Sequence, residues 1–206
     1  MTKEIRKERE REEMRNLILD AAGQIIAEEG IEKLSIRKIA HKIEYSAGII
    51  YHYFHGKDDI VEHLLQKGYL EMVSGIRSVQ SEVQSGSPSV ILKKSLEQFI
   101  TMALSEGSQY RNIMLNDSQA ILDHTSVLYK GASQERKAIG MLCQCLSQFQ
   151  HMKGKDELYI ERTAQVIWSS AFGLIMRLMV EKDLPNEQRD ALISRYLDAM
   201  LAIAEY

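Results

Sequence analysis

The sequence predicts an all-α protein of about nine helices, with a small N-terminal helical domain and a larger helical domain behind it. Three observations support this fold class. Only two prolines occur in 206 residues, and proline is the strongest breaker of helices. Apolar residues recur at spacings of three and four over most of the chain, as they do on one face of a helix. Capping residues and glycines stand where these periodic stretches begin and end.

Short capping signals divide the N-terminal part into four predicted helices. Gly30 ends the first, since glycine is favoured where a helix closes. Ser35 and Ser46 precede the second and third as N-caps. Lys57-Asp58-Asp59 opens the fourth, where acidic residues suit the positive end of the helix dipole. The four helices are expected at 14–30, 36–43, 47–54 and 57–84.

The clearest break in the chain is Ser85-Gly86-Ser87-Pro88, which combines a flexible pair, a capping serine and a proline suited to a first helical turn. The boundary between 122 and 130 has the weakest signal. We expect two domains, residues 1–60 and residues 61–206. The helices expected beyond the break lie at about 88–105, 109–122, 127–152, 156–182 and 186–205.

Cys143 and Cys145 stand two apart in a helical pattern, so their side chains point roughly 200° apart around the axis. This spacing suits neither a disulfide nor a shared metal, and we expect two small buried hydrophobes in a reducing cytoplasm. The N-terminus lacks the apolar segment of a signal peptide. Unbroken apolar runs fall short of the ~18 residues of a membrane span, so no membrane partner is expected.

Residues 35–57 (SIRKIAHKIEYSAGIIYHYFHGK) carry the strongest functional pattern. In its first helix the apolar residues share one face, and Arg37, Lys38, His41 and Lys42 share the other. A break and a second short helix follow, as in a helix-turn-helix that places its second helix in the DNA major groove. Residues 33–57 hold five lysines and arginines against one glutamate, in a chain of net charge −3. This local excess predicts that one end of an acidic body meets phosphates.

Residues 3–13, which precede the first predicted helix, alternate positive and negative side chains. Two interpretations are open. The segment is either a solvated, partly frayed helix start or a basic arm that reaches the DNA backbone or minor groove. Five interspersed glutamates weaken the second interpretation.

Residues 34–61 resemble the N-terminal domain of the tetracycline-repressor (TetR) family of transcriptional regulators. The Tyr-x-Tyr-Phe-x-x-Lys pattern is the most specific part of the resemblance. It implies a sequence-specific DNA-binding regulator, most often a repressor released by a small molecule, that binds a pseudo-palindromic operator as a homodimer. The matching residues are Ser35, Arg37-Lys38-Ile39-Ala40, Ile43, Ser46-Ala47-Gly48, Ile50-Tyr51-His52-Tyr53-Phe54 and Lys57.

The resemblance also implies a role for individual residues. Ser35 and Tyr51 would donate hydrogen bonds to phosphate oxygens, and Lys57 would meet a phosphate with its charge. Arg37 would address a guanine in the groove. Tyr53 and Phe54 are expected in the core. The residues of the recognition helix that would face bases or backbone are Ser46, Ala47, Gly48, Ile49 and His52.

Three positions depart from the family's pattern. Glu44 stands where the family usually has glycine in the turn, and Tyr45 where it often has valine. Ile49 stands where polar residues are common; it either contacts a thymine methyl or packs. The front of the recognition helix therefore has few hydrogen-bonding side chains. We expect Arg37, His52 and DNA shape to carry a larger share of specificity.

Residues 88–206 resemble the family's ligand-binding and dimerisation domain more weakly. Trp168…Phe172-Gly173 is similar to the Trp…His-Gly signature of one TetR subclass, with Phe172 in place of the histidine. Methionines and aromatics in this part suit an adaptable cavity for an apolar or amphipathic effector, and equally a plain core. The candidate pocket residues are Phe99, Met102, Tyr110, Met114, Tyr129, Met141, Trp168, Phe172 and Met176.

The last two predicted helices carry long apolar faces, which either complete the core of a monomer or form a four-helix interface with a second copy. In the family they form the interface. Two copies would read half-sites roughly 34–36 Å apart. The expected interface residues are Ala164, Ile167, Ala171, Ile175, Leu192, Tyr196, Met200 and Ile203.

Other classes of function have little support. The sequence has no nucleophile elbow, no His-Glu-x-x-His, no phosphate-cradling glycine loop and no clustered metal ligands, so no enzyme, cofactor or metal is expected. A helical adaptor for protein partners would not need the cations of residues 35–57. Within the regulator hypothesis, ligand and DNA oppose each other by an equal factor in both directions, and the fourth helix is the expected lever.

Overall fold

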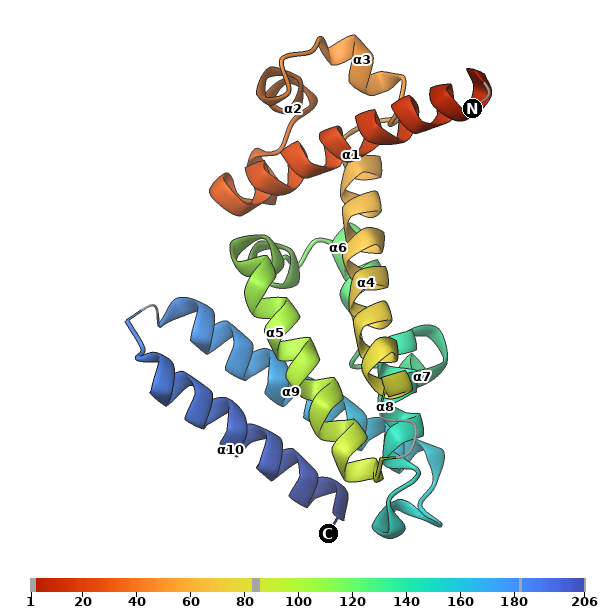
Figure 1. The fold of residues 1–206 in the computed structure, drawn as a ribbon, viewed down its shortest axis with the longest axis vertical. Helices are drawn as coiled ribbons and strands as arrows, with labels where there is room; N and C mark the ends of the chain where they lie inside the picture. The colour runs from red at the N-terminus through yellow and green to blue at the C-terminus, as the bar shows by residue number, and fades with distance from the viewer. Residues whose placement is uncertain (1–2, 83–85, 182, 206) are drawn as a thin grey trace. The chain divides into compact units, whose positions relative to one another are not determined.

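The computed structural model describes residues 3–82, 86–181 and 183–205. All regular secondary structure in these ranges is helical, so the predicted all-α class is confirmed (Figure 1). The described residues form ten α-helices where about nine were expected. In chain order they are α1 (Lys3–Glu29), α2 (Ile36–Lys42), α3 (Ala47–Tyr51), α4 (Lys57–Glu82), α5 (Pro88–Met114), α6 (Gln119–Thr125), α7 (Ala132–Glu135), α8 (Lys137–Leu146), α9 (Glu157–Val180) and α10 (Asn186–Glu205). Two short 3-10 helices, η1 (Ile31–Lys33) and η2 (Gln150–Met152), lie between them.

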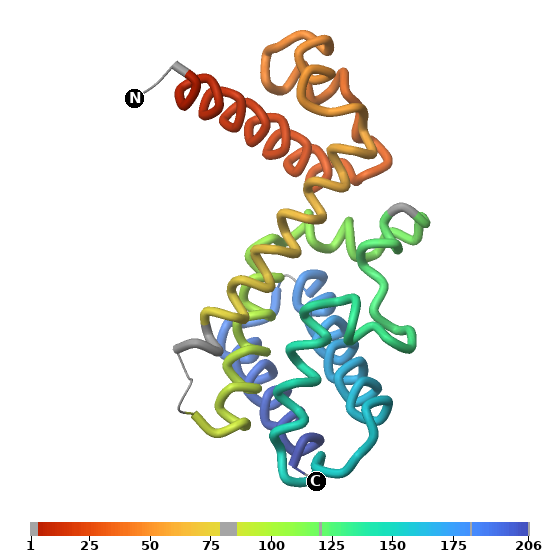
Figure 2. Tube along the Cα trace, turned by 90° about the vertical axis from the view of Figure 1, so that its right-hand side faces the viewer, coloured from red at the N-terminus to blue at the C-terminus, as the bar shows by residue number. Residues whose placement is uncertain are grey.

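The helices form two compact units, each built from two stretches of chain. One unit extends to Gly68 and also includes Gly107–Thr125. The other comprises Tyr69–Glu106 and the residues from Ser126 onward. Two helices, α4 and α5, therefore contribute residues to both units, and both can be followed along the trace in Figure 2.

Helices α2, α3 and α4 begin at the predicted residues, whereas α1 begins at Lys3 instead of 14 and α3 ends at Tyr51 instead of 54. The Ser35 hydroxyl oxygen accepts the Lys38 N–H at 3.3 Å, which is the expected N-cap of α2. Ser46 occupies the N-cap position of α3 without a side-chain hydrogen bond to it. Helix α1 begins at Lys3, and residues 4–13 form exposed helical turns. The predicted end of the fourth helix at 84, Ser85, and the predicted end at 182 lie outside the described residues.

The core of the first unit joins α1–α4 to the stretch 107–125. Ile18, Ile39 and Ile50 are fully buried in it, and Ile113 and Ile121 belong to the same cluster. Polar contacts join the stretch to α1 as well, because the Asn112 side chain donates to the Ile26 carbonyl at 2.7 Å. Residues distant in the sequence thus complete the core beneath the helix-turn-helix.

The prediction of a single helix over 127–152 is wrong. The chain breaks at Gly131, which has a left-handed φ of 93°, and again at Arg136, which is extended between α7 and α8. The buried carboxylate of Glu161 holds this break, accepting the backbone N–H of Gly131 and Ser133, each at 2.9 Å, and the Ser133 hydroxyl. Hydrogen bonds from Ser133 hold the pKa of Glu161 below its usual range. Hydrogen bonds to Glu161, which is distant in the sequence, therefore stabilise a break where the local pattern predicted a continuous helix.

The helices predicted at 88–105 and 109–122 also differ from the structure. Helix α5 runs on to Met114, with a break at Gly107 where φ is 53° and ψ is −122°. The next helix, α6, begins only at Gln119. Glycine tolerates this positive φ without the strain that a side chain would cause, so the break in α5 falls at Gly107.

The close approach of α7 and α8 generates a testable prediction. A Cβ added at Gly140 would lie 2.6 Å from the Ser133 carbonyl oxygen. We expect Gly140→Ala to lower the free energy of unfolding by about 1–3 kcal/mol, because backbone must move to admit the methyl group. Urea unfolding followed by circular dichroism measures the change.

The matched control is Gly68→Ala in α4, where nothing lies within 4 Å of the added Cβ. This substitution should stabilise the chain by up to about 1 kcal/mol, since alanine favours a helix over glycine. Equal effects of the two substitutions would show that the contact between α7 and α8 does not constrain residue 140.

Candidate nucleic-acid interface and apolar cavity

Helices α2 and α3 meet at a turn closed by Glu44. This residue has a φ of 59°, the one positive value of a non-glycine residue among the described residues. The Glu44 N–H donates to the His41 carbonyl at 3.2 Å, and the Tyr45 N–H donates to the Ala40 carbonyl at 2.9 Å. These two bonds form the Schellman closure that glycine usually makes. Glutamate at this position therefore costs roughly 1–2 kcal/mol in backbone conformation.

The predicted contact residues all reach the surface at least in part. Ile50 anchors α3 because it is fully buried, whereas Tyr51 is 58% exposed. Phe54 is buried and Tyr53 half-buried, as expected of core residues. Arg37, Ser46, Gly48, Tyr51 and His52 are exposed, and Ser35, Ala47, Ile49 and Lys57 are half-buried.

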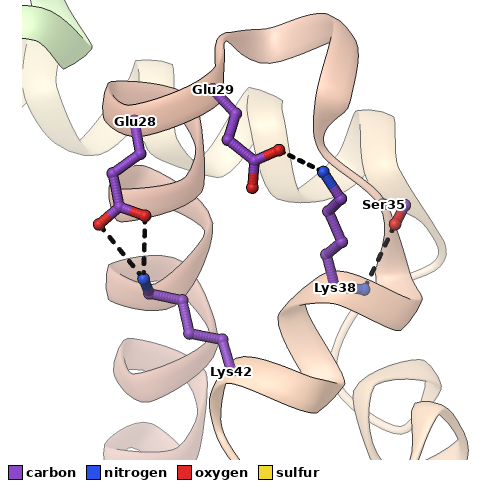
Figure 3. A network of polar contacts seen from close by, with 5 residues as sticks. All are labelled: Glu28, Glu29, Ser35, Lys38 and Lys42. Atoms are coloured by element: carbon purple, nitrogen blue, oxygen red, sulfur yellow. Dashed lines mark hydrogen bonds and ion pairs between the residues drawn. The ribbon is translucent and has the colours of Figure 1, made fainter.

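The cations of the helix-turn-helix fall into two groups. Lys38 forms an ion pair with Glu29, and the Lys42 ammonium lies 3.4 Å from both carboxylate oxygens of Glu28 (Figure 3). Both partners come from the last turn of α1. Within the described part of the chain, neither the guanidinium of Arg37 nor the ammonium of Lys57 has an ion-pair partner.

The segment between α3 and α4 is held by contacts that the sequence did not reveal. The Arg15 guanidinium from α1 stacks 4.6 Å from the centre of the Phe54 ring and donates to the Tyr53 carbonyl at 2.9 Å. The Asp59 carboxylate accepts the His55 N–H at 2.7 Å. These contacts fix the chain just before Lys57. No periodic or capping signal identifies Arg15, because its partners lie 38 residues away.

A small apolar cavity of about 40 Å³ lies in the second unit. Of the predicted pocket residues, Phe99, Met141 and Trp168 line it. The Ser95 hydroxyl also lines it and is a buried group with no hydrogen-bond partner among the described residues. The remaining lining residues are Met72, Ile76, Leu92, Leu96, Ala138, Leu142 and Cys145.

The other predicted pocket residues do not line this cavity. Tyr110 and Met114 belong to the first unit. Burial raises the pKa of Tyr110 well above its usual value. The Tyr129 hydroxyl donates to Glu135 at 2.7 Å. Phe172 stacks on Trp168 with ring centres 5.5 Å apart and is not among the residues that line the cavity. Met102 and Met176 are half-buried on α5 and α9.

The two cysteines are free thiols on α8. Cys145 is buried and Cys143 half-buried, and burial raises the pKa of each to about 11. Both are therefore protonated at neutral pH and serve as packing groups. The described residues contain no group of three or more His, Cys, Asp or Glu side chains that could hold a metal ion.

The residues predicted for a dimer interface divide between core and surface. Ala164, Ile167, Ala171 and Ile175 are fully buried within the single chain, and Met200 is 7% exposed. The Tyr196 side chain is half-buried and donates to the Ile167 carbonyl at 3.0 Å. Leu192 and Ile203 are exposed.

A different line of residues places an apolar row on the outer face of α9. Tyr159, Val166, Gly173 and Val180 recur every seven residues and are all exposed. Among the described residues α9 alone is long and apolar enough to cross a membrane, judged by length and composition, and only 22% of its most apolar window is buried. A core helix of a soluble protein passes the same test.

Comparisons with known proteins support the resemblance seen in the sequence. Residues 18–64 match the family model described as bacterial regulatory proteins, tetR family. No curated protein is similar enough in sequence to this chain to be matched.

Several solved structures share the fold over nearly the whole chain. The fatty acid degradation regulator FadR from Bacillus halodurans is 20% identical, with a TM-score of 0.72, over 91% of this chain and 94% of its own. SmeT is a repressor from Stenotrophomonas maltophilia. Its complex with triclosan is 18% identical, with a TM-score of 0.68, over 91% of this chain and 90% of its own. A TetR-family regulator from Rhodococcus sp. is 20% identical, with a TM-score of 0.66, over 93% of this chain and 98% of its own.

The identities to these structures are low, so they establish the fold, while the family model identifies the helix-turn-helix. Residues 18–64 therefore carry the likeness to the tetR family of bacterial regulatory proteins, and the solved structures extend the likeness in fold to the rest of the chain.

Proposed function

We propose that this chain is a cytoplasmic, sequence-specific DNA-binding repressor, which a small apolar ligand releases from a pseudo-palindromic operator. The observation that carries the proposal is a folded helix-turn-helix whose nine candidate contact residues are all at least partly exposed. The 58% exposure of Tyr51 supports a role at the DNA surface, since tyrosine combines an apolar body with a hydroxyl suited to interfaces.

The proposed contacts divide into those that anchor and those that read. The Ser35 oxygen already accepts a backbone N–H of α2, which leaves the hydroxyl proton for a phosphate oxygen. Tyr51 and Lys57 complete the anchoring set. Arg37, exposed in the first turn of α2, is the proposed reader of guanine. His52 and the shape of the DNA contribute the remaining preference.

Two substitutions separate anchoring from reading. Lys57→Ala should weaken binding to every duplex about uniformly, because one phosphate contact is lost. The slope of log affinity against log salt concentration (the salt slope) should become less steep by about 0.9. Arg37→Ala should relax the preference at one base pair, at a cost of about 1–3 kcal/mol. The measurement is fluorescence anisotropy at several salt concentrations, with an operator selected from a random pool and a scrambled duplex.

Equal weakening of operator and scrambled duplex by Arg37→Ala would assign Arg37 to the backbone. Binding of the unaltered chain that did not depend on salt would exclude the proposed function.

The apolar cavity is the proposed effector site. Its lining is apolar apart from Ser95, which supports a largely uncharged ligand with one hydrogen-bonding group. The SmeT–triclosan complex shows that a protein of this fold takes a small aromatic ligand. Because the free space is small, a ligand must displace side chains, and the lining methionines Met72 and Met141 can adapt. Met72 lies on α4, as does Lys57, so a displaced α4 would couple the ligand to DNA affinity.

Ser95→Ala tests the polar group of this cavity. Phenol should bind the unaltered chain more tightly than toluene does, because the phenol hydroxyl can form a hydrogen bond with the Ser95 hydroxyl, which has no partner in the free protein. The advantage of phenol should disappear in Ser95→Ala. Fluorescence titration measures both affinities, since Trp168 is the one tryptophan of the sequence and lines the cavity. Ser105→Ala, at an exposed hydroxyl on the same helix, is the control and should keep the preference for phenol.

A homodimer is the proposed form that binds DNA. The heptad line Tyr159, Val166, Gly173 and Val180 on α9 is exposed, and it offers one of the two apolar rows that a helix seam contains. Leu192 and Ile203, exposed on α10 at 39% and 40%, offer a second apolar surface. Two copies joined by these helices would form a four-helix interface of the self-complementary kind common in dimers.

Val166→Lys should dissociate this dimer, because it places a charge on an apolar seam. Sedimentation velocity measures the change in mass, and operator affinity should fall in parallel. Val90→Lys, at an exposed valine on α5, is the matched control and should leave both unchanged. A Val166→Lys chain that sedimented like the unaltered protein would remove α9 from the interface.

A further inference from the structure

We infer that Glu28 and Glu29 are specificity-determining residues, which withhold Lys38 and Lys42 from the DNA backbone and so weaken binding to non-specific DNA. The inference rests on the proposed DNA-binding function. Figure 3 shows both lysines reaching from α2 to adjacent carboxylates at the end of α1. Two of the cations that the sequence assigns to the helix-turn-helix are therefore neutralised within the protein.

The pairs lie at the surface rather than in the core. The side chains of Lys38 and Glu29 are 42% and 43% exposed, and those of Lys42 and Glu28 are 29% and 62% exposed. Ion pairs as exposed as these contribute little to stability. Their main effect is therefore on the electric field that the helix-turn-helix presents to a phosphate.

The position of the two glutamates is unfavourable for α1 itself. They occupy the last turn of the helix, which holds no basic residue. The C-terminal end of a helix carries the negative pole of its dipole, so acidic side chains are disfavoured there. The placement of the two glutamates conflicts with the preference against acidic residues in a last helical turn, and such conflicts tend to occur at functional sites.

Pairing reduces the two components of DNA affinity unequally. Non-specific affinity arises almost entirely from cations at phosphates. A lysine must leave its carboxylate before it meets a phosphate, and the carboxylate that remains repels the backbone. Base reading by Arg37 does not require either lysine. The glutamates therefore lower non-specific binding more than operator binding, which raises the ratio between them.

This effect matters more in a protein with a weak base-reading surface. The front of α3 is Ala47-Gly48-Ile49, which offers no side-chain hydrogen bonds to bases. Lysine contacts that form only in the non-specific complex, where Arg37 is not docked on a base, add affinity for any sequence. Discrimination improves when these contacts are suppressed.

The test replaces both acids by Glu28→Gln and Glu29→Gln in the full chain and measures binding to a random-sequence duplex over a range of salt. We expect affinity at low salt to rise by about three- to tenfold. The salt slope should steepen by up to about 0.9 for each lysine released. Affinity for the selected operator should rise less, so the ratio of specific to non-specific binding should fall.

A double-mutant cycle separates pairing from a general change in charge. In a chain that carries Lys38→Gln and Lys42→Gln, the two glutamate substitutions should have no further effect if they act through the lysines. An equal gain in both backgrounds, or no gain in the unaltered background, would overturn the inference. Glu28→Gln alone should give the smaller gain, because its ion pair is the longer one.

The experiment also distinguishes this inference from the proposed function. If the unaltered chain fails to bind any duplex, the DNA-binding function is wrong and the inference falls with it. If the unaltered chain binds with a clear dependence on salt and the glutamate variants bind identically, only the inference is overturned. Circular dichroism melting of each variant verifies that it retains the fold.

Discussion

The candidate DNA interface depends on the burial of Ile50 and Phe54. Helix α3 spans only Ala47–Tyr51, and isolated helices shorter than about 12–15 residues are marginal in water. Ile50 is fully buried and Phe54 is 2% exposed, so packing holds this helix in place. Arg15 covers the Phe54 ring from α1. Because these contacts use one face of α3 and the chain behind it, the opposite face remains open to solvent.

Local signals made the N-terminal helices predictable, whereas distant contacts decided the region after Thr125. The Ser35 cap involves a partner three residues away, within the range that sequence patterns describe. The break that separates α7 from α8 depends on Glu161, which lies 28 residues beyond Ser133. The pattern of apolar residues in 127–152 does not indicate a contact with that carboxylate. A continuous helix was therefore the natural prediction from local pattern alone.

The same distinction applies to the candidate site. The exposure of Arg37 and Tyr51 follows from the helix-turn-helix pattern, because the apolar positions of α2 and α3 determine which face is free. The pairing of Lys38 and Lys42 does not, since their partners lie on another helix. Glu44 was identified as a departure from the family's glycine, and its positive φ explains why glycine is usual there.

The division of the first unit between two stretches of chain limits how far it is a separable module. Ile113 and Ile121 share the core of α1, and Asn112 bonds the Ile26 carbonyl. A fragment that stopped at Gly68 would leave that side of α1 bare, with apolar surface exposed where α5 and α6 now cover it. Grafting the helix-turn-helix onto another sensor protein would therefore require the stretch 107–125 to travel with it.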